Sequence, residues 1–232
     1  MANLDTFEDI ITDIKDRFDD QSSSTDTSAR RWTSQVLMDI WSKRKWKFAR
    51  KIGTITTVAS QENYSLASDY DFGGVYDVYD TTNDFKLFPV QNQQFDLVYP
   101  NPSTTGKPQF YRLWDVDADN IQVIRLYPIP AGVYTVKYKY YRVPSNMTTG
   151  TETPPLPNKY RELLVLGPLA MLFEKDQNPQ ANIQWAKYNQ KLNQMISDYA
   201  EEPGDLDIMQ SEDYFKSNLP IIQYPSNYPD LY

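Results

Sequence analysis

Residues 42–58 read SKRKWKFARKIGTITTV, and the spacing of the apolar residues changes within this stretch. Before it, apolar residues recur every three or four positions, as they do on one face of a helix. From Lys51 onward, β-branched residues alternate with a period of two, which is typical of a β-strand. We therefore expect the chain to pass from helix to strand near Lys51.

The sequence before this change predicts two helices. Between Leu4 and Phe18, apolar residues follow the i, i+3, i+4, i+7 spacing of an amphipathic helix. The polar break Gln21–Ser24 ends this helix, and a second helix is predicted from Asp26 to Phe48. Basic residues in the last turns of the second helix are stabilised by the helix dipole, whose negative end lies there.

The sequence after the change predicts about seven short strands, separated by turns rich in Pro, Gly, Asn and Asp. The strand at Val133–Arg142 has the clearest alternation. Such a series predicts an antiparallel sandwich or a partly closed barrel. The other predicted strands are Ile52–Val58, Gly74–Tyr79, Asp84–Phe88, Phe95–Tyr99, Gln109–Trp114 and Asn120–Tyr127.

Two more helices are predicted after the Pro-rich bridge Pro154–Pro157. The first carries an apolar stripe between Tyr160 and Met171. The second begins with Asn178 as its cap and Pro179 at its first position, and it ends at Pro203. Aromatic residues at helical spacing are interpreted as the core of a helical bundle. They are Trp32, Trp41, Trp185 and Tyr188.

This order of elements predicts an α+β fold. A discontinuous helical bundle, residues 1–49 and 155–202, carries an inserted antiparallel β-sandwich or barrel-like module, residues 50–154. Residues 203–232 have no sustained period but combine Pro with aromatic residues, so we expect an extended C-terminal arm that orders against a partner. The candidate arm contacts are Tyr214, Phe215, Tyr224, Tyr228 and Tyr232.

The composition excludes several kinds of chemistry. The 232 residues contain no Cys and no His, which excludes disulfides, thiolate nucleophiles, Cys/His zinc sites and imidazole bases. The Gly106–Lys107 pair lacks the rest of a phosphate-binding loop. Asp69 and Asp71 are interpreted as a solvated turn. We predict no catalytic residue, no cofactor and no metal ligand, and therefore no enzyme.

An acidic turn imitates part of a calcium-binding loop. Asp115, Asp117 and Asp119 have the spacing of its first three ligands. The loop then requires Gly and a bidentate Glu, whereas this chain has Asn120 and Leu126. The sequence therefore favours a turn between two strands.

Charge is unevenly distributed along the chain, whose net charge of −8 argues against a free-standing DNA-binding protein. Residues 30–51 hold eight cations and one acid, whereas residues 198–232 hold eight acids and one cation. The cations near Trp46 and Phe48 leave three interpretations open: a solvated helix end, nucleic-acid binding by charge and stacking, or docking on an acidic protein. These cations are Lys43, Arg44, Lys45, Lys47, Arg50 and Lys51.

No membrane-spanning or secretory segment is expected. The longest apolar stretch, Leu163–Phe173, is shorter than the roughly 20 residues that a spanning helix needs, and it contains Gly167 and Pro168. The N-terminal residues are acidic and amphipathic, unlike a signal peptide.

Several segments together resemble the portal adaptors, also called head-to-tail connector or neck proteins, of short-tailed phages with elongated heads. The resemblance covers roughly residues 26–200 and depends on the order of the segments. They are KIGTITTVASQENYSL (51–66), GKPQFYRL (106–113), IRLYPIP (124–130), YTVKYKYYRVP (134–144) and PPLPNKYRELLVLGPLAMLFEKDQNPQ (154–180).

This resemblance implies a structural protein of the virion, assembled in the host cytoplasm. Such proteins form a dodecameric ring beneath the portal, extend the channel for DNA and its ejection, and give tail or nozzle proteins a docking surface. The implied partners are the portal, further copies of the chain, tail proteins and, non-specifically, DNA in the channel; the basic residues 43–51 would face portal or DNA. Two alternatives remain open: another tail or nozzle protein, and a carbohydrate-binding or hydrolytic tail protein.

Overall fold

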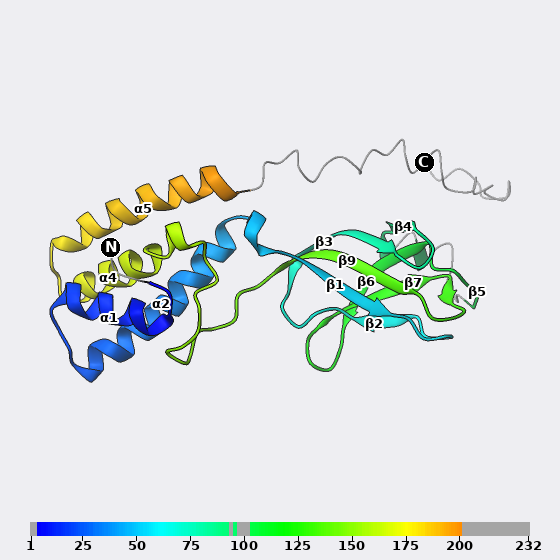
Figure 1. Ribbon diagram of the computed structural model, residues 1–232, viewed down its shortest axis with the longest axis horizontal. Coiled ribbons are helices and arrows are strands. Elements are labelled where there is room, and N and C mark those ends of the chain that lie inside the picture. The colour runs from blue at the N-terminus through cyan, green and yellow to red at the C-terminus, as the bar shows by residue number, and fades with distance from the viewer. Residues whose placement is uncertain (1–3, 93–94, 97–102, 201–232) are drawn as a thin grey trace, which may run out of the picture. The chain divides into compact units, whose positions relative to one another are not determined.

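The computed structural model describes residues 4–92, 95–96 and 103–200, which belong to one compact unit. The predicted arm and the predicted helix end at Pro203 lie outside the described residues. The helices and strands follow the order expected for an α+β fold, with strands between two pairs of helices (Figure 1). The fold class predicted from the sequence is therefore confirmed.

Four α-helices are present in the described part of the chain, with two short 3-10 helices. No helix of this part has the length and apolarity needed to cross a membrane. The α-helices are α1 (Phe7–Phe18), α2 (Ser23–Lys43), α4 (Leu163–Lys175) and α5 (Gln180–Tyr199), and the 3-10 helices are η1 (Lys47–Ala49) and η2 (Asn158–Tyr160).

Local polar contacts fix where the helices begin. Thr6 and Asp9 form a capping box, in which each side chain accepts the backbone N–H of the other residue at 2.9–3.2 Å. Ser22 caps α2 by accepting from the amide of Thr25 at 3.3 Å. The last helix begins at Gln180 with Pro179, rather than Asn178, at the cap position, and the amide of Gln180 donates to Asn178 Oδ1 at 3.0 Å.

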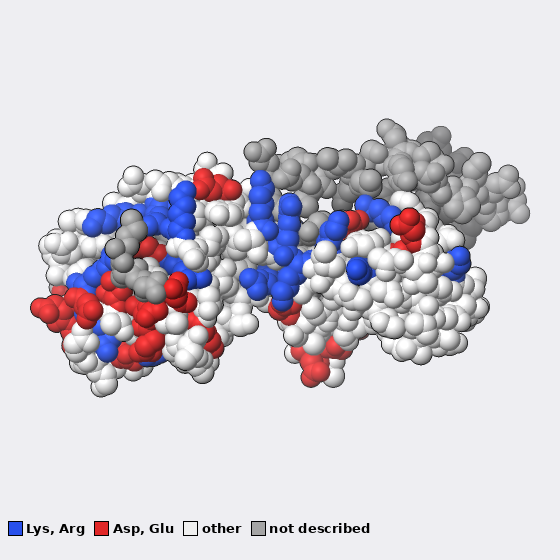
Figure 2. All heavy atoms as spheres, in the orientation of Figure 1, with Lys and Arg blue, Asp and Glu red and all other residues white. Residues whose placement is uncertain are grey.

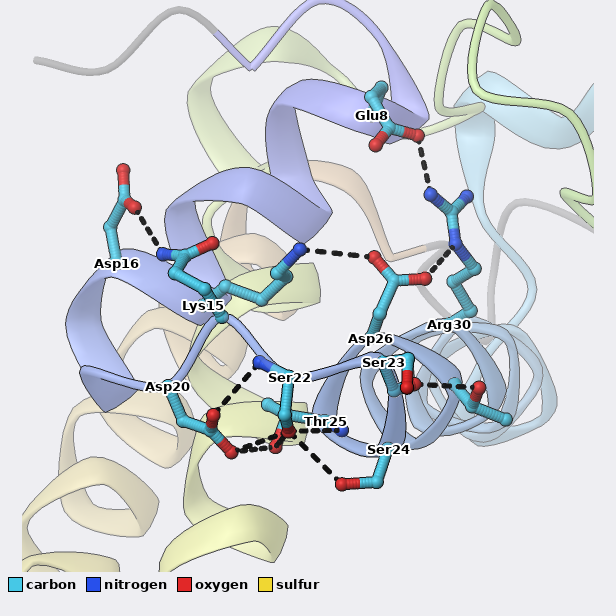
Figure 3. A network of polar contacts seen from close by, with 12 residues as sticks. Glu8, Lys15, Asp16, Asp20, Ser22, Ser23, Ser24, Thr25, Asp26 and Arg30 are labelled. Atoms are coloured by element: carbon cyan, nitrogen blue, oxygen red, sulfur yellow. Dashed lines mark hydrogen bonds and ion pairs between the residues drawn. The ribbon is translucent and has the colours of Figure 1, made fainter.

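A chain of ion pairs joins α1 to α2 (Figure 3). Arg30 lies between Glu8 and Asp26, with N–O distances of 2.6 and 2.8 Å, and Lys15 approaches the other oxygen of Asp26 at 3.4 Å. Because hydrogen bonding from Arg30 outweighs partial burial, the pKa of Asp26 is held below its ordinary value. These ion pairs therefore connect α1 directly to α2.

The helical core forms where α2, α4 and α5 cross. Gly167 on α4 lets the helices approach closely: a Cβ there would lie 2.9 Å from both methyl carbons of Val36 and 3.3 Å from the ring of Tyr188. Trp41 and Tyr188 are buried in this core, and Trp32 and Trp185 pack against it. The interpretation of these four aromatic residues as bundle core is confirmed.

Seven strands form one sheet in the order β1-β9-β3-β4-β6-β7-β2, and two short strands, β5 and β8, form a separate pair (Figure 1). The edge strands β1 and β2 approach each other, since the hydroxyl of Tyr64 accepts from the amide of Val58 at 3.1 Å. The sheet is therefore a nearly closed barrel. Its strands are β1 (Arg50–Thr56), β2 (Asn63–Ser65), β3 (Tyr70–Asp80), β4 (Phe85–Pro89), β5 (Thr105–Gly106), β6 (Phe110–Val116), β7 (Gln122–Tyr127), β8 (Ile129–Pro130) and β9 (Thr135–Arg142).

Contacts connect the sheet directly to the helices. Tyr141, near the end of β9, belongs to the helical core rather than to the barrel core. The indole N–H of Trp41 on α2 donates to the carbonyl of Arg142 at 2.7 Å. The barrel has its own core of alternating residues, which includes Val78, Ile124 and Tyr138.

Three expectations about the elements were wrong. The second helix ends at Lys43 rather than Phe48, because Arg44 is extended and the chain then forms η1. Phe95, expected to begin a strand, is helical, and residues 97–99 lie outside the described part.

The third error concerns strand direction. The sheet is not wholly antiparallel, since β4 and β6 pair in parallel, with Phe88 opposite Phe110. The long connection between these two strands allows such a crossover.

Candidate functional site

The residues 43–51, called the basic segment below, carry the chain from α2 into β1. All six of its cations are exposed, whereas Trp46 and Ala49 are buried. Figure 2 shows Lys and Arg side chains gathered over this part of the molecule. The segment therefore presents one face of positive charge and one apolar face.

The apolar face is anchored by an aromatic cluster. Trp46 is 0% exposed, and its indole N–H donates to the carbonyl of Ile40 at 3.0 Å, which satisfies one of the last carbonyl groups of α2. Its ring stacks on Phe48 with centroids 5.7 Å apart, and Phe48 meets Trp41 and Tyr199 edge-on at 5.5 and 5.7 Å. Base stacking on Trp46, considered from the sequence, is thus excluded in this structure because the ring is inside the core.

Contacts with neighbouring residues define the positions of Lys43, Lys45 and Lys51. Lys43 pairs with Asp39 one helical turn earlier at 3.1 Å, and Lys51 pairs with Asp69 at 2.7 Å. The amine of Lys45 lies 5.4 Å from the ring centroid of Tyr141, within the range of a cation–π contact. These contacts fix the side chains on the surface of the junction between helices and sheet.

Asp69 is part of a polar cluster rather than a simple solvated turn. Its two oxygens accept from Lys51 at 2.7 Å and from the hydroxyl of Tyr140 at 2.6 Å. Burial alone would raise the pKa of Asp69, but these two hydrogen bonds outweigh it and hold the pKa below its ordinary value. Burial and the hydrogen bond to Asp69 raise the pKa of Tyr140.

A polar hollow of about 320 Å³ lies beside this cluster and includes Lys51, Asp69, Arg142 and Glu152 in its lining. Glu152 accepts the backbone amides of Thr148 and Thr149 at 2.6 and 2.9 Å. Both lining carboxylates therefore have structural partners, and their hydrogen bonds hold the loop and the sheet end in place.

The acidic turn between β6 and β7 uses a carboxylate to shape its backbone. Asp117 Oδ1 accepts the amides of Asp119 and Ile121 at 3.0 and 2.9 Å, and Oδ2 accepts from Ser65 at 2.6 Å. Across the described ranges, no group of three acidic side chains is placed to hold a metal ion. The turn predicted from the sequence is what the structure contains here.

The sequence analysis missed a second surface, on the outer side of β6. Arg112 is buried with its guanidinium 4.2 Å from the Phe95 ring and 4.4 Å from the Trp114 ring, and it pairs with Asp96 at 2.7 Å. Trp114 remains 50% exposed. Alternation within Gln109–Trp114 could have placed Trp114 outward, but it could not have shown the arginine beneath it.

The end of α5 lies beside the basic segment, because Ala200 forms an antiparallel bridge with Trp46. The predicted arm contacts Tyr214, Phe215, Tyr224, Tyr228 and Tyr232 lie outside the described residues. What the structure brings together is therefore a set of exposed cations above aromatic side chains that pack in the helical core.

The family model described as SU10 adaptor protein matches residues 5–210 of the chain. The chain therefore belongs to the SU10 adaptor family and is a phage adaptor protein with a structural role in the virion. None of the curated proteins matches the sequence.

Proposed function

We propose that the chain is a portal adaptor of a short-tailed phage. Copies would form a ring beneath the portal, dodecameric as the sequence resemblance implies, which extends the DNA channel and gives tail proteins a docking surface. The observation that carries this proposal is the family match, which includes all four described helices and the whole sheet. In this role the protein needs neither a catalytic residue nor a cofactor.

The basic segment is our candidate for the portal-facing surface. Its cations project from a backbone that Trp46 and Phe48 anchor in the helical core, so this backbone loses little additional freedom on binding. Complementary charge accelerates association and selects the partner. We expect an acidic portal surface opposite Arg44 and Lys47, with DNA in the channel as a weaker, non-specific contact.

Residues 203–232 are proposed as an arm that strengthens the assembly. A chain truncated after Glu202 keeps every described helix and strand, so it should fold, but it should occupy portal less completely than the full chain. Hydrogen exchange should show slower exchange of the arm amides after assembly than before it. Equal occupancy by the truncated and the full chain would show that these residues are not an assembly element.

The proposal is tested by mixing the full chain with the portal of the same phage and imaging the particles. An added symmetric ring is expected at micromolar protein. The variant R44E/K47E should bind portal more weakly, with a reduced dependence on salt. The matched control K175E/K187E changes the net charge equally at exposed positions on α4 and α5 and should bind as the wild type does.

Portal particles that stay bare with the wild-type chain would contradict the adaptor assignment. Incorporation of the chain elsewhere in the tail would favour the nozzle alternative. Binding to glycan by a stable monomer that ignores portal would favour the carbohydrate-binding alternative.

A further inference from the structure

Two large apolar side chains are exposed on different strands of the barrel. Ile52 on β1 is 59% exposed, and Trp114 on β6 is 50% exposed. Both point outward, because the adjacent Gly53 faces Tyr138 of the barrel core and the adjacent Leu113 packs against that core. An exposed tryptophan held in place by a buried arginine is the kind of side chain that dominates binding energy at protein interfaces.

The order of strands sets the directions of these two side chains. Going around the barrel from β1 to β6, the strands β9, β3 and β4 lie on one path, and β2 and β7 lie on the other. In a nearly closed barrel of seven strands, outward residues on β1 and β6 therefore face nearly opposite directions. The two apolar side chains belong to two separate surfaces.

The surface around Ile52 is basic. Its cross-strand partner is Lys139, and Lys137 lies opposite Thr54 on the same outward face. Arg50 is the next outward residue of β1. Asp77 on the adjacent strand β3 is shared by Lys139 and Lys86 at 2.9 and 2.8 Å, so the two amines exceed this carboxylate in charge. We call this surface the Ile52 face.

The surface around Trp114 is acidic. Asp115, the next residue along β6, and Asp119, in the turn that follows β6, are both exposed. The positive charge of Arg112 is buried and paired with Asp96. We call this surface the Trp114 face. Each of the two faces thus has an apolar centre with charge of one sign around it, which is the anatomy of a specific protein interface.

We propose that the Trp114 face of one copy of the chain docks on the Ile52 face of the next copy. Opposite charges attract across this contact, whereas either face would repel its own equivalent in a two-fold dimer. A head-to-tail contact between nearly opposite faces continues from copy to copy and gives a closed ring when the rotation permits. The inference rests on the proposed function only in requiring that copies assemble side by side.

Cross-linking tests the contact directly, because the chain has no cysteine of its own. The variants T54C and A118C place one thiol on each face, the second in the turn beside Asp119, while keeping Ile52 and Trp114. Assembled with portal as an equal mixture and treated with a short bismaleimide, they should give dimers linked between positions 54 and 118. Each variant assembled alone should give almost none, and I183C, exposed on α5, is the matched control.

Charge reversal gives an independent measurement. D119K and K137E should each reduce occupancy of the ring about tenfold at limiting protein concentration. A mixture of the two variants should recover it, because in an alternating ring every contact again joins opposite charges. Asp119 is chosen because its carboxylate is exposed, whereas Asp117 shapes the turn.

The outcomes separate the two proposals. A wild-type chain that leaves portal bare contradicts the proposed function. A complete ring without linkage between positions 54 and 118, or linkage of 118 to 118, overturns the head-to-tail contact while leaving the adaptor function intact. Full ring occupancy by both charge-reversal variants would overturn it as well.

Discussion

The close approach of Gly53 to Tyr138 gives the sharpest stability prediction. Gly53 lies on β1 opposite Tyr138 on β9, and the tyrosine ring covers the glycine. A Cβ added at position 53 would lie 2.6 Å from Cε1 of Tyr138 and closer still to two further atoms of that side chain. The Gly53→Ala variant therefore requires the ring to move.

The cost of this movement follows from the surroundings of the ring. Tyr138 is buried in the barrel core, packs against Tyr140 with centroids 5.4 Å apart, and accepts the amide of Ala67 at 2.8 Å through its hydroxyl. Overpacking of a core costs about 1–3 kcal/mol, and loss of this hydrogen bond adds about 1 kcal/mol. We expect Gly53→Ala to lower the free energy of unfolding by about 2–4 kcal/mol.

The assay is urea unfolding at 25 °C, followed by circular dichroism. The matched control is Gly132→Ala, because nothing lies within 4 Å of a Cβ at that position, and its effect should stay within about 0.5 kcal/mol. In a Tyr138→Ala background, Gly53→Ala should cost much less than it does in the wild type. Equal losses for the two glycine variants, or full additivity with Tyr138→Ala, would refute the steric argument.

Two further predictions concern the helices. In Gly167→Ala, crowding against Val36 should outweigh the better helix propensity of alanine. Urea unfolding should show a free energy of unfolding lower by about 1–2 kcal/mol. In a Val36→Ala background, the same change should be nearly neutral or stabilising. Because Arg30 lowers the pKa of Asp26 in the folded state, this pair stabilises the protein above the unfolded pKa near 3.8, and its contribution is lost as the pH falls through the lower folded value. The stability difference between wild type and Arg30→Gln, measured at pH 7, 5 and 3, should therefore shrink toward pH 3; a constant difference would contradict this reading of the ion pair.

The sequence alone predicted whether most segments form helices or strands, and the order in which they follow one another. The alternation at Val133–Arg142 and the change of period near Lys51 correspond to β9 and to the start of β1. These signals are readable because they depend on which side of a single helix or strand is buried. The α+β class follows from them, since the strands stand between two pairs of helices.

The pairing of the strands was not readable from the sequence. β2 has three residues, too few for a periodic pattern, yet it forms one edge of the sheet. The parallel pairing of β4 with β6 depends on a long connection between them and on packing with the rest of the barrel. Pairing between distant segments is a property of the whole chain, so local periodicity could not predict it.

For the exposed surfaces, too, the sequence determined some features and the tertiary structure determined others. The exposed charge of the basic segment was predicted from its residue types, because six cations so close together in the sequence cannot all be buried. Only the tertiary structure determines which aromatic side chains are exposed and can contact a partner. Trp46 is enclosed by the helices because its ring and its N–H both find partners there, whereas Trp114 stays exposed because Arg112 occupies the space beneath it. The opposite placement of Ile52 and Trp114 likewise depends on the order of strands around the barrel, which no single stretch of sequence contains.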